Sequence, residues 1–353
     1  RISFDQRGFC NACQWMEKKK KIDWSIREQE LVGILKNSKN KNSNYDCIVP
    51  VSGGKDGAYV AQKLKNNYGL NVLTVTSRPP LESSVGITNL QKFISSGYDH
   101  IHVTPNTKAM KKMNKLGLIL KGSPYYGWLV SIFSVVLRVA IQNNINLIFY
   151  GEDGEIEYGG STKNKNQALF DTNYVIQNYF EGDYQKIKEQ SKLTKEELFW
   201  FDIEGVNKEN LENIKLTHWG YFEPWDSYRN YLEAKKNYGL EESESANEGT
   251  FTNFAQNDQA LFALHMYLMY LKFGFGRATQ DAGIEIRRGA MDRDQAVNLA
   301  KLYDNNYPEN FIQLYLDYYE MTINEFNEVL DKFANKDLFE KKKERWIPKY
   351  QIL

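Results

Sequence analysis

The feature that most constrains this chain is a segment, residues 46–51, that is apolar after Asp46 and runs directly into a short glycine-rich segment, residues 52–57. The pattern predicts a strand, a tight turn and a helix that begins near Gly57. Paired glycines let backbone N–H groups approach an anion closely, and a helix N-terminus adds unpaired N–H groups and a positive dipole end. The Ser52 hydroxyl and the Lys55 ammonium add further donors. The segment therefore predicts a phosphate-binding loop, and with it a nucleotide ligand.

The spacing within residues 52–57 excludes two better-known phosphate loops. A Walker-type loop needs four residues between its first glycine and a Gly-Lys-Ser/Thr run, and the dinucleotide fingerprint needs Gly-x-Gly-x-x-Gly. The segment instead resembles the Ser-Gly-Gly-x-Asp-Ser/Gly pattern of the PP-loop, or N-type, ATP pyrophosphatases. Those enzymes cleave ATP between its α- and β-phosphates, so the resemblance implies adenylylation of a substrate oxygen. The alternative is an ordinary strand–turn–helix corner, but packing gives no reason for a lysine and an aspartate beside the glycines.

Composition narrows the class of protein. A chain of 353 residues with 42% hydrophobic and 25% charged residues can bury a large core, and its length predicts two domains or one with a sizeable extension. Basic and acidic residues number 45 each, which argues against nucleic acid as the main partner. The most apolar helix candidate, residues 128–141, is too short for a bilayer and carries Arg138, so we expect no membrane span.

The number of cysteines and the first residues of the chain indicate the cellular compartment. Three cysteines are too few for a disulfide framework, and no secretory signal opens the chain, so we expect a cytoplasmic protein with further residues before Arg1 in the gene product. Cys10 and Cys13 form a Cys-x-x-Cys knuckle of the kind that supplies half of a tetrahedral zinc site. Either the remaining ligands precede Arg1, or the knuckle holds no metal. Cys47 falls in the first predicted strand, where we expect it to pack as a small apolar residue.

Strands and helices alternate along the next part of the chain at spacings that predict a parallel sheet with helices on both faces. The predicted strands are residues 46–51, 72–76, 100–103 and 146–150, and the predicted helices between them are residues 57–67, 86–96 and 126–143. In such sheets ligands bind beyond the carboxyl ends of the strands, which places a nucleotide at the loops after Val51, Thr76 and Tyr150. The expected units are a knuckle segment at 1–30, an α/β nucleotide-binding domain at 31–175 and a mainly helical region at 176–353.

The segment after Tyr150, residues 151–161, contains four carboxylates and four glycines at the edge where this sheet predicts a site. Acidic groups there can hold magnesium on the phosphates of a nucleotide. Asp56 and Glu152 are the best candidates because each lies immediately beyond a strand. The alternative is a polar surface loop.

The region beyond residue 175 carries helix caps. Capping-box spacing occurs at Thr194 with Glu197, Asp292 with Gln295 and Thr322 with Glu325, and Asp226 precedes a helix that ends at Gly239. Residues 261–271 are apolar nearly all round and predict a core helix, in which we expect His265 to be hydrogen-bonded rather than catalytic. In the loop after that helix, Arg277 can clamp a phosphate or a carboxylate through its planar guanidinium, unless this loop is an ordinary salt-bridged helix junction.

Five motifs together resemble the N-acetyl sugar amidotransferase family over nearly the whole chain. They are the knuckle at Cys10 and Cys13, residues 52–57, Gly151-Glu152 with residues 157–160, residues 249–253 (Gly-Thr-Phe-Thr-Asn) and residues 273–279 (Phe-Gly-Phe-Gly-Arg-Ala-Thr). The motifs of the second half separate this family from other PP-loop enzymes. Family members usually carry another Cys-x-x-Cys near the start, and this sequence shows none.

This resemblance implies a fold and a reaction. The fold is the PP-loop ATP pyrophosphatase type, also described as adenine-nucleotide alpha-hydrolase-like, with a mainly helical C-terminal region. The reaction converts an acetamido group of an activated sugar or a nonulosonic acid into an acetamidino group, in the synthesis of bacterial surface polysaccharides such as O-antigen or of flagellar glycans. Attack of the amide oxygen on the α-phosphate of ATP makes an O-adenylyl imidate, from which AMP departs readily.

The resemblance also implies roles for individual residues. Lys55 stabilises charge that develops between the phosphates, and Asp56 and Glu152 hold magnesium, so these three are the implied catalytic residues. The implied ATP-binding residues are Ser52, Gly53, Gly54, Lys55, Asp56, Gly57, Thr76 and Gly151. The implied sugar-binding residues are Glu157, Tyr158, Gly159, Gly160, Arg277 and Asp281, and the implied ligands of a structural zinc are Cys10 and Cys13.

Ammonia for this reaction needs a source, because the sequence shows no N-terminal nucleophilic cysteine and no cysteine-centred glutaminase motif. The resemblance implies separate glutaminase and ammonia-channel subunits like those of histidine biosynthesis, and a homo-oligomer is compatible with it. An alternative function is a PP-loop enzyme that thiolates tRNA; it would show a basic surface and cysteines near the sheet, whereas charge here is balanced and only Cys47 lies in the nucleotide domain. A third is a non-catalytic, nucleotide-binding regulatory protein, which needs no magnesium carboxylates.

Overall fold

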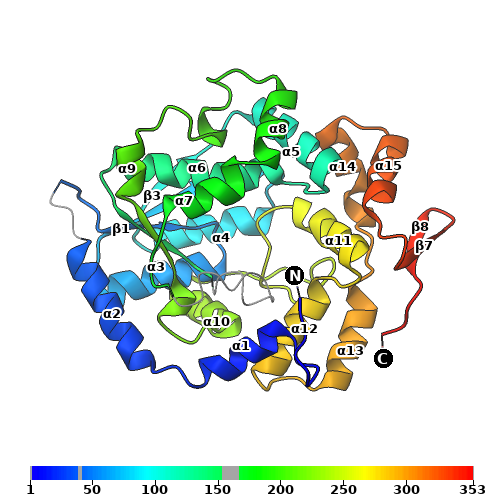
Figure 1. The fold of residues 1–353 in the computed structure, drawn as a ribbon, viewed down its shortest axis with the longest axis horizontal. Helices are drawn as coiled ribbons and strands as arrows, with labels where there is room; N and C mark the ends of the chain where they lie inside the picture. Colours follow the sequence, from blue (N-terminus) through cyan, green and yellow to red (C-terminus); the bar gives the residue numbers. More distant parts are fainter. Residues whose placement is uncertain (1, 39–41, 153–166, 353) are drawn as a thin grey trace.

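A computed structural model describes residues 2–38, 42–152 and 167–352 of the chain. Its centre is a six-stranded sheet with the order β3-β2-β1-β4-β6-β5 (Figure 1). The strands are β1 (Cys47–Pro50), β2 (Val72–Ser77), β3 (Asp99–Val103), β4 (Leu147–Tyr150), β5 (Phe170–Asp171) and β6 (Lys215–His218). All neighbouring strands are parallel except β5 and β6. The structure thus confirms the predicted parallel sheet, with β5 as one antiparallel strand at its edge.

Helices cover both faces of the sheet (Figure 1). The alternation of side chains along β1 explains this, because Cys47 and Val49 belong to one apolar layer, Ile48 belongs to the other, and all three are fully buried. The first layer includes residues of α2 (Trp24–Asn37), α3 (Lys55–Tyr68), α4 (Ser84–Ser95) and α10 (Ser227–Tyr238). The second includes residues of α5 (Thr107–Lys121), α6 (Tyr126–Gln142), α11 (Leu261–Phe273), α14 (Ile312–Tyr319) and α15 (Ile323–Phe333).

The other elements are short or peripheral. They are α1 (Asn11–Lys19), α7 (Thr172–Val175), the π-helix η2 (Ile176–Phe180), α8 (Asp183–Ser191), η3 (Phe199–Phe201), α9 (Lys208–Glu212), η4 (Trp219–Tyr221), α12 (Arg277–Arg287), α13 (Arg293–Tyr303), η5 (Glu309–Phe311) and the hairpin β7 (Phe339–Lys342) with β8 (Arg345–Pro348). Helix α1 contacts α12, far from it in sequence (Figure 1). Within the described ranges, no helix combines the length and the apolar character that a bilayer span requires.

Two elements of the sheet come from places where the sequence predicts no strand. Strand β6 lies in the region expected to be mainly helical, and it pairs in parallel with β4, while β5 pairs with its other edge. The sheet is therefore not confined to residues 31–175. Four residues are too few for alternation to identify a strand, so the unsatisfied edge of β4 decides this pairing. The rest of the region beyond residue 175 is mainly helical, as predicted.

Helix α5 is also absent from the sequence-based expectations. It contains Gly117, a poor helix former, which weakens the local signal. The glycine has a packing reason, because a Cβ atom there would lie 2.1 Å from the Cβ of Tyr126, at the start of α6. The close approach of α5 to α6 therefore requires the residue that obscures the helix in the sequence.

The predicted caps form, although one of them does not begin an α-helix. Asp292 and Thr322 make complete capping boxes at α13 and α15, and Asp226 caps α10. Thr194 and Glu197 also exchange both capping-box hydrogen bonds, at 2.9 and 3.3 Å. After Thr194, however, the chain forms a turn that leads into η3.

Helix α11 is the buried core helix that the sequence predicts. The ring of His265 lies against Tyr125, with centroids 4.7 Å apart, and burial lowers the pKa of His265 to about 4. The Nδ1 atom of His265 has no hydrogen-bond partner in the described part of the chain, so the hydrogen bond expected from the sequence does not form at that atom. At neutral pH this imidazole is uncharged and packs as an aromatic ring.

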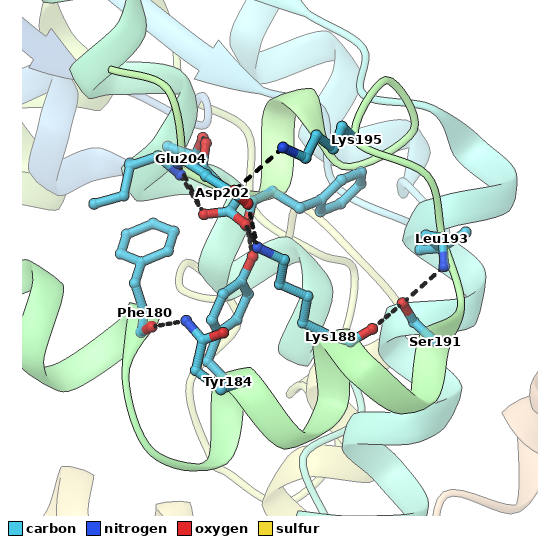
Figure 2. Close-up of polar contacts among 12 residues, drawn as sticks. Phe180, Tyr184, Lys188, Ser191, Leu193, Lys195, Asp202 and Glu204 are labelled. Atoms are coloured by element: carbon cyan, nitrogen blue, oxygen red, sulfur yellow. Dashed lines mark hydrogen bonds and ion pairs between the residues drawn. The ribbon is translucent and has the colours of Figure 1, made fainter. Parts of the chain in front are cut away.

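A polar cluster fastens the segment between β5 and β6 to α6. Lys188 of α8 forms ion pairs with Asp202 at 2.5 Å and with Glu204 at 2.7 Å (Figure 2). Ser134 and Arg138 of α6 donate hydrogen bonds to the carbonyl oxygen of Asp202. The side chain of Asp202 is only 10% exposed, so its charge depends on these neighbours for stabilisation.

Replacing Lys188 with methionine should destabilise the fold by about 2 kcal/mol, because the largely buried Asp202 loses its cation while the methionine preserves most of the apolar stem. Chemical denaturation at pH 7 measures this change. Lys195→Met is the matched control, because Lys195 is 83% exposed and its nitrogen is 3.4 Å from Glu204. Equal midpoints for the two variants would contradict the assignment of Lys188 as the stabilising partner.

Candidate nucleotide-binding site

A cavity of about 460 Å³ opens beyond the carboxyl ends of β1, β2 and β4. The chain runs from β1 outward to β2 and β3 on one side, and β4 and β6 lie on the other side, so the sheet changes direction between β1 and β4. Ligands of doubly wound sheets bind at this switch point. The cavity is lined by residues 52–57, the ends of β2 and β4, the first half of α6, residues 254–258 and Arg277.

The glycines of the loop allow a tight connection between β1 and α3. Gly53 has a φ of +85°, and a Cβ atom on it would lie 2.5 Å from the backbone nitrogen of Leu90. A Cβ atom on Gly57 would lie 2.5 Å from the carbonyl oxygen of Pro50. Helix α3 begins at Lys55, two residues before the predicted start, so Gly57 lies within its first turn.

The position of Gly54 is what suits the loop to an anion. Gly54 is the N-cap of α3, and a Cβ atom on it would meet, among the described residues, only the Ser52 hydroxyl, at 3.5 Å. The space beside Gly54 is therefore open to the cavity, and the first-turn N–H groups of α3 lack intrahelical partners. These N–H groups are the kind of donors that bind anions at helix N-termini, and together with the open space beside Gly54 they are here called the cradle.

Two neighbouring charged residues of the loop are held together. The ammonium of Lys55 is 2.6 Å from a carboxylate oxygen of Asp56, and the lysine side chain is only 7% exposed. Asn230 of α10 donates a hydrogen bond to Asp56 at 3.0 Å, and Tyr238 of the same helix donates one to the Gly53 carbonyl at 3.1 Å. Helix α10 thus braces the loop from outside. The cap of this helix can be recognised in the sequence, but Asn230 and Tyr238 cannot, since neither belongs to a recognisable motif.

Asp258 is a further residue of the site that sequence analysis missed. Its carboxylate accepts a hydrogen bond from the Ser52 hydroxyl, and its carbonyl accepts one from the Ser83 amide at 3.0 Å. A Cβ atom on Gly86 would lie 2.5 Å from the Cα of Asp258, so α4 and this segment are in close backbone contact. Burial raises the pKa of Asp258 to about 6. Only the tertiary structure brings this residue to the loop, 206 positions after Ser52 in the sequence numbering.

Thr76 lies behind the loop. It is buried, and its hydroxyl donates a hydrogen bond to the Val51 carbonyl at 2.5 Å. The next residue, Ser77, lines the cavity, and its carbonyl accepts a hydrogen bond from the indole of Trp128 at 3.0 Å. Thr76 therefore holds β1 and β2 in register, and the structure places Ser77 where the sequence predicts Thr76 to face the nucleotide.

The end of β4 meets the loop directly. A Cβ atom on Gly151 would lie 2.6 Å from the carbonyl carbon of Asp56 and 2.7 Å from the nitrogen of Gly57. Glu152 lines the cavity with a largely exposed side chain, 4.0 Å from His218. Asp56 and Glu152 therefore line the same cavity. Among the described residues no three histidine, cysteine, aspartate or glutamate side chains form a cluster, and residues 157–160, the predicted sugar-binding segment, lie outside the described ranges.

Of the two predicted sugar-binding residues in α12, Arg277 lines the cavity and Asp281 is buried behind it. Arg277, the first residue of α12, lines the cavity, and its guanidinium is 2.8 Å from the carboxylate of Asp281, one turn later. Asp281 is buried and also accepts a hydrogen bond from Thr250 at 2.6 Å. Asp281 therefore orients Arg277 from behind. The sequence left two alternatives here, a salt-bridged helix junction and a ligand-facing loop. The structure shows the ion pair of the first, and Arg277 also lines the cavity.

The cysteine knuckle lies outside the cavity. The sulfur atoms of Cys10 and Cys13 are 3.5 Å apart, and Cys10 caps α1. Burial raises the pKa of the Cys13 thiol, an effect that the hydrogen bond with Cys10 increases and that Arg287 of α12 opposes. Two sulfurs at this separation suit one half of a tetrahedral metal site. The described residues supply no other cysteine or histidine to complete it.

Comparison with known proteins gives two findings. Residues 248–351 match the family described as LPS biosynthesis protein WbpG-like, C-terminal domain. Among solved structures, one similar chain is the U34-tRNA thiolase NcsA from Methanococcus maripaludis with its [4Fe-4S] cluster; the similarity is distant, at 12% identity and a TM-score of 0.31, and covers 88% of this chain and 82% of that chain. No curated protein matches.

The glycines of the loop should respond differently to alanine. Gly54→Ala should cost less than about 1 kcal/mol of stability but weaken binding of an ATP analogue at least tenfold, because the new methyl enters the cradle. Gly57→Ala should cost about 2 kcal/mol, because the methyl overlaps the Pro50 carbonyl. Thermal unfolding and isothermal titration calorimetry measure the two effects. The cradle is misplaced if Gly54→Ala binds the analogue normally.

The raised pKa of Asp258 makes stability depend on pH. The folded state binds its proton more tightly than the unfolded state, so this residue lowers stability progressively as pH rises from about 4 to 6. Asp258→Asn should therefore match wild type near pH 4 and exceed its stability by about 2 kcal/mol at pH 7.5. Urea denaturation across this range is the measurement, with the exposed Asp337→Asn as control. A difference that does not change with pH would contradict the assignment.

Proposed function

We propose that this protein is an ATP-dependent, AMP-forming amidotransferase that converts an acetamido group of an activated sugar into an acetamidino group in bacterial glycan biosynthesis. One observation carries the proposal. The C-terminal segment that matches an LPS biosynthesis family contributes Asp258 and Arg277 to the same cavity as the phosphate-type loop at residues 52–57. The loop supports nucleotide chemistry, and the shared cavity supports coupling of that chemistry to a glycan precursor.

The proposed reaction has two balanced steps. The acetamido oxygen attacks the α-phosphorus of ATP, the bond to the β-phosphate oxygen breaks, pyrophosphate leaves and the amide nitrogen loses its proton. Ammonia then adds to the carbon of the O-adenylyl imidate, and AMP leaves with the former carbonyl oxygen. The products are an acetamidino sugar, AMP and pyrophosphate. ATP is needed because an amide oxygen cannot otherwise leave.

The residues of the cavity suit these steps. In this proposal the N-terminus of α3 beside Gly54 holds the phosphates, and Lys55 stabilises charge on the departing pyrophosphate. Asp56 and Glu152 would hold magnesium, which supplies charge neutralisation on the phosphate oxygens when bound. One or two carboxylates suffice for this ion because substrate phosphates provide its other ligands.

The sugar would be held by groups that face the same space. Arg277, oriented by Asp281, offers a planar fork for the diphosphate of a nucleotide-linked sugar or for the carboxylate of a nonulosonic acid. Glu157, Tyr158, Gly159 and Gly160 belong to this proposal on sequence resemblance alone.

Ammonia would come from separate glutaminase and ammonia-channel subunits. Cys47 is fully buried, and burial raises the pKa of its thiol, so it cannot act as a glutaminase nucleophile. Cys10 and Cys13 lie outside the cavity and are proposed as zinc ligands. A cytoplasmic location and a possible homo-oligomer complete the proposal.

Thiolation of tRNA is the alternative reaction for a loop of this type. It requires a reactive cysteine or a cysteine-bound cluster near the adenylylated carbonyl. None of the described residues that line the cavity is a cysteine. This observation favours an amine as the second substrate.

The reaction itself tests the proposal. Purified protein with ATP, magnesium, ammonium and a panel of UDP-linked acetamido sugars and CMP-linked nonulosonic acids should release AMP and pyrophosphate only when an acceptor is present. Lys55→Met should lower this rate at least a hundredfold, since about 2.7 kcal/mol of transition-state stabilisation is a typical contribution of such a group. Lys63→Met, on the same helix but outside the cavity, is the control. Release of ADP, or AMP release that requires tRNA, would contradict the proposal.

A further inference from the structure

The β4 side of the cavity has a wall of aromatic side chains, here called the aromatic subsite. Its six residues come from α6, β4, β5, α7, η2 and β6, and they are Phe133, Tyr150, Phe170, Tyr174, Tyr179 and His218. The described segments that form it therefore surround the end of β4, next to the phosphate-type loop. The subsite is continuous with the nucleotide cradle and has a different chemical character.

A π-helix shapes this wall. The five residues of η2 include Tyr179, whose ring stacks on Phe133 with centroids 3.9 Å apart and planes inclined by 27°. Phe170 stacks on His218 at 5.1 Å in the same way. Short π-helices are rare, less favourable than α-helices, and frequent at functional sites. A need to turn Tyr179 toward a ligand would explain why this segment forms a π-helix rather than an α-helix.

Tyr150 adds a polar group to this apolar wall. Tyr150 lines the cavity, and its buried hydroxyl has no hydrogen-bond partner within the described ranges. A buried hydroxyl without a partner costs about 1–3 kcal/mol, a cost that a ligand atom can offset. Burial raises the pKa of Tyr150 well above its usual range, so the phenol stays protonated and can both donate and accept.

We propose that the aromatic subsite binds the acetamido-bearing ring of the acceptor sugar, with the ring against Phe133 and Tyr179 and the acetamido group hydrogen-bonded to Tyr150. This inference rests on the proposed function. Aromatic faces suit the apolar C–H face of a sugar ring, and one buried hydroxyl suits one polar substituent. A hydrogen bond accepted by Tyr150 from the amide N–H would leave the carbonyl oxygen free to react.

The cavity offers different places for the acceptor sugar and for the adenine ring of ATP. Tyr150 directly precedes Gly151, which contacts the backbone of Asp56 and Gly57, so the subsite adjoins the phosphate cradle. On the other side of β1, Val75, Ser77 and Trp128 line the same cavity and leave a second wall for the base. If the phosphates of ATP lie between these two walls, adenine binds at the wall of Val75, Ser77 and Trp128, and the acceptor sugar binds at the aromatic subsite.

Ligand binding without turnover tests the inference. In saturation-transfer NMR with UDP-N-acetylglucosamine, the acetamido methyl protons should receive strong saturation from the wild-type protein. Tyr150→Phe and Tyr179→Leu should weaken binding about tenfold, which corresponds to about 1.4 kcal/mol. UDP-glucose, which lacks the acetamido group, should bind weakly and be insensitive to Tyr150→Phe. Tyr303→Phe on α13, outside the cavity, is the control for loss of a tyrosine hydroxyl.

The inference would be overturned if the wild-type protein did not saturate the methyl group, or if wild type and both variants saturated it equally. It would also be overturned if Tyr179→Leu lost affinity for a non-hydrolysable ATP analogue, because that result would assign the subsite to adenine. The test is separable from the proposed reaction. Acetamido-sugar binding that depends on Tyr150, in a protein that releases no AMP, would support the subsite and contradict the reaction. AMP release with an unchanged KM for the sugar in Tyr150→Phe would support the reaction and contradict the subsite.

Discussion

The cavity depends on one close backbone contact, at the point where β1 and β4 diverge. Gly151 at the end of β4 touches the backbone of Asp56 and Gly57, and Gly57 touches the carbonyl of Pro50. The ends of the two strands therefore meet the start of α3 backbone to backbone. This contact sets the direction of the N-terminus of α3, which points its positive dipole end at the cavity. The other groups of the cavity are arranged around that N-terminus.

Both halves of the chain build the site, which explains why its polar groups are held so firmly. Helix α10 braces the phosphate-type loop through Asn230 and Tyr238, and Asp258 accepts a hydrogen bond from Ser52. Arg277 is oriented by a buried carboxylate. Groups that are already positioned lose little entropy when a ligand binds.

Local patterns predicted the part of the fold that local forces control. The strand, loop and helix at residues 46–67, the core helix at 261–271 and three of the caps follow from side-chain period and capping chemistry, and the structure confirms them. Strand β6 and helix α5 escaped prediction for opposite reasons. β6 is too short to show a period and forms because β4 offers it an edge, while α5 contains Gly117 for the sake of its contact with Tyr126.

The sequence by itself determined that a glycine-rich turn and a helix come directly after a buried strand, because that property depends on residues adjacent in the chain. It also made Glu152 and Arg277 candidates for the site, and both residues line the cavity. Only the tertiary structure decided that Ser77 rather than Thr76 lines the cavity, that Asp281 stands behind Arg277, and that Asp258 meets Ser52. Those outcomes depend on which face of a strand or helix is turned inward and on which distant segments pack together, and the burial of apolar surface across the whole chain governs both.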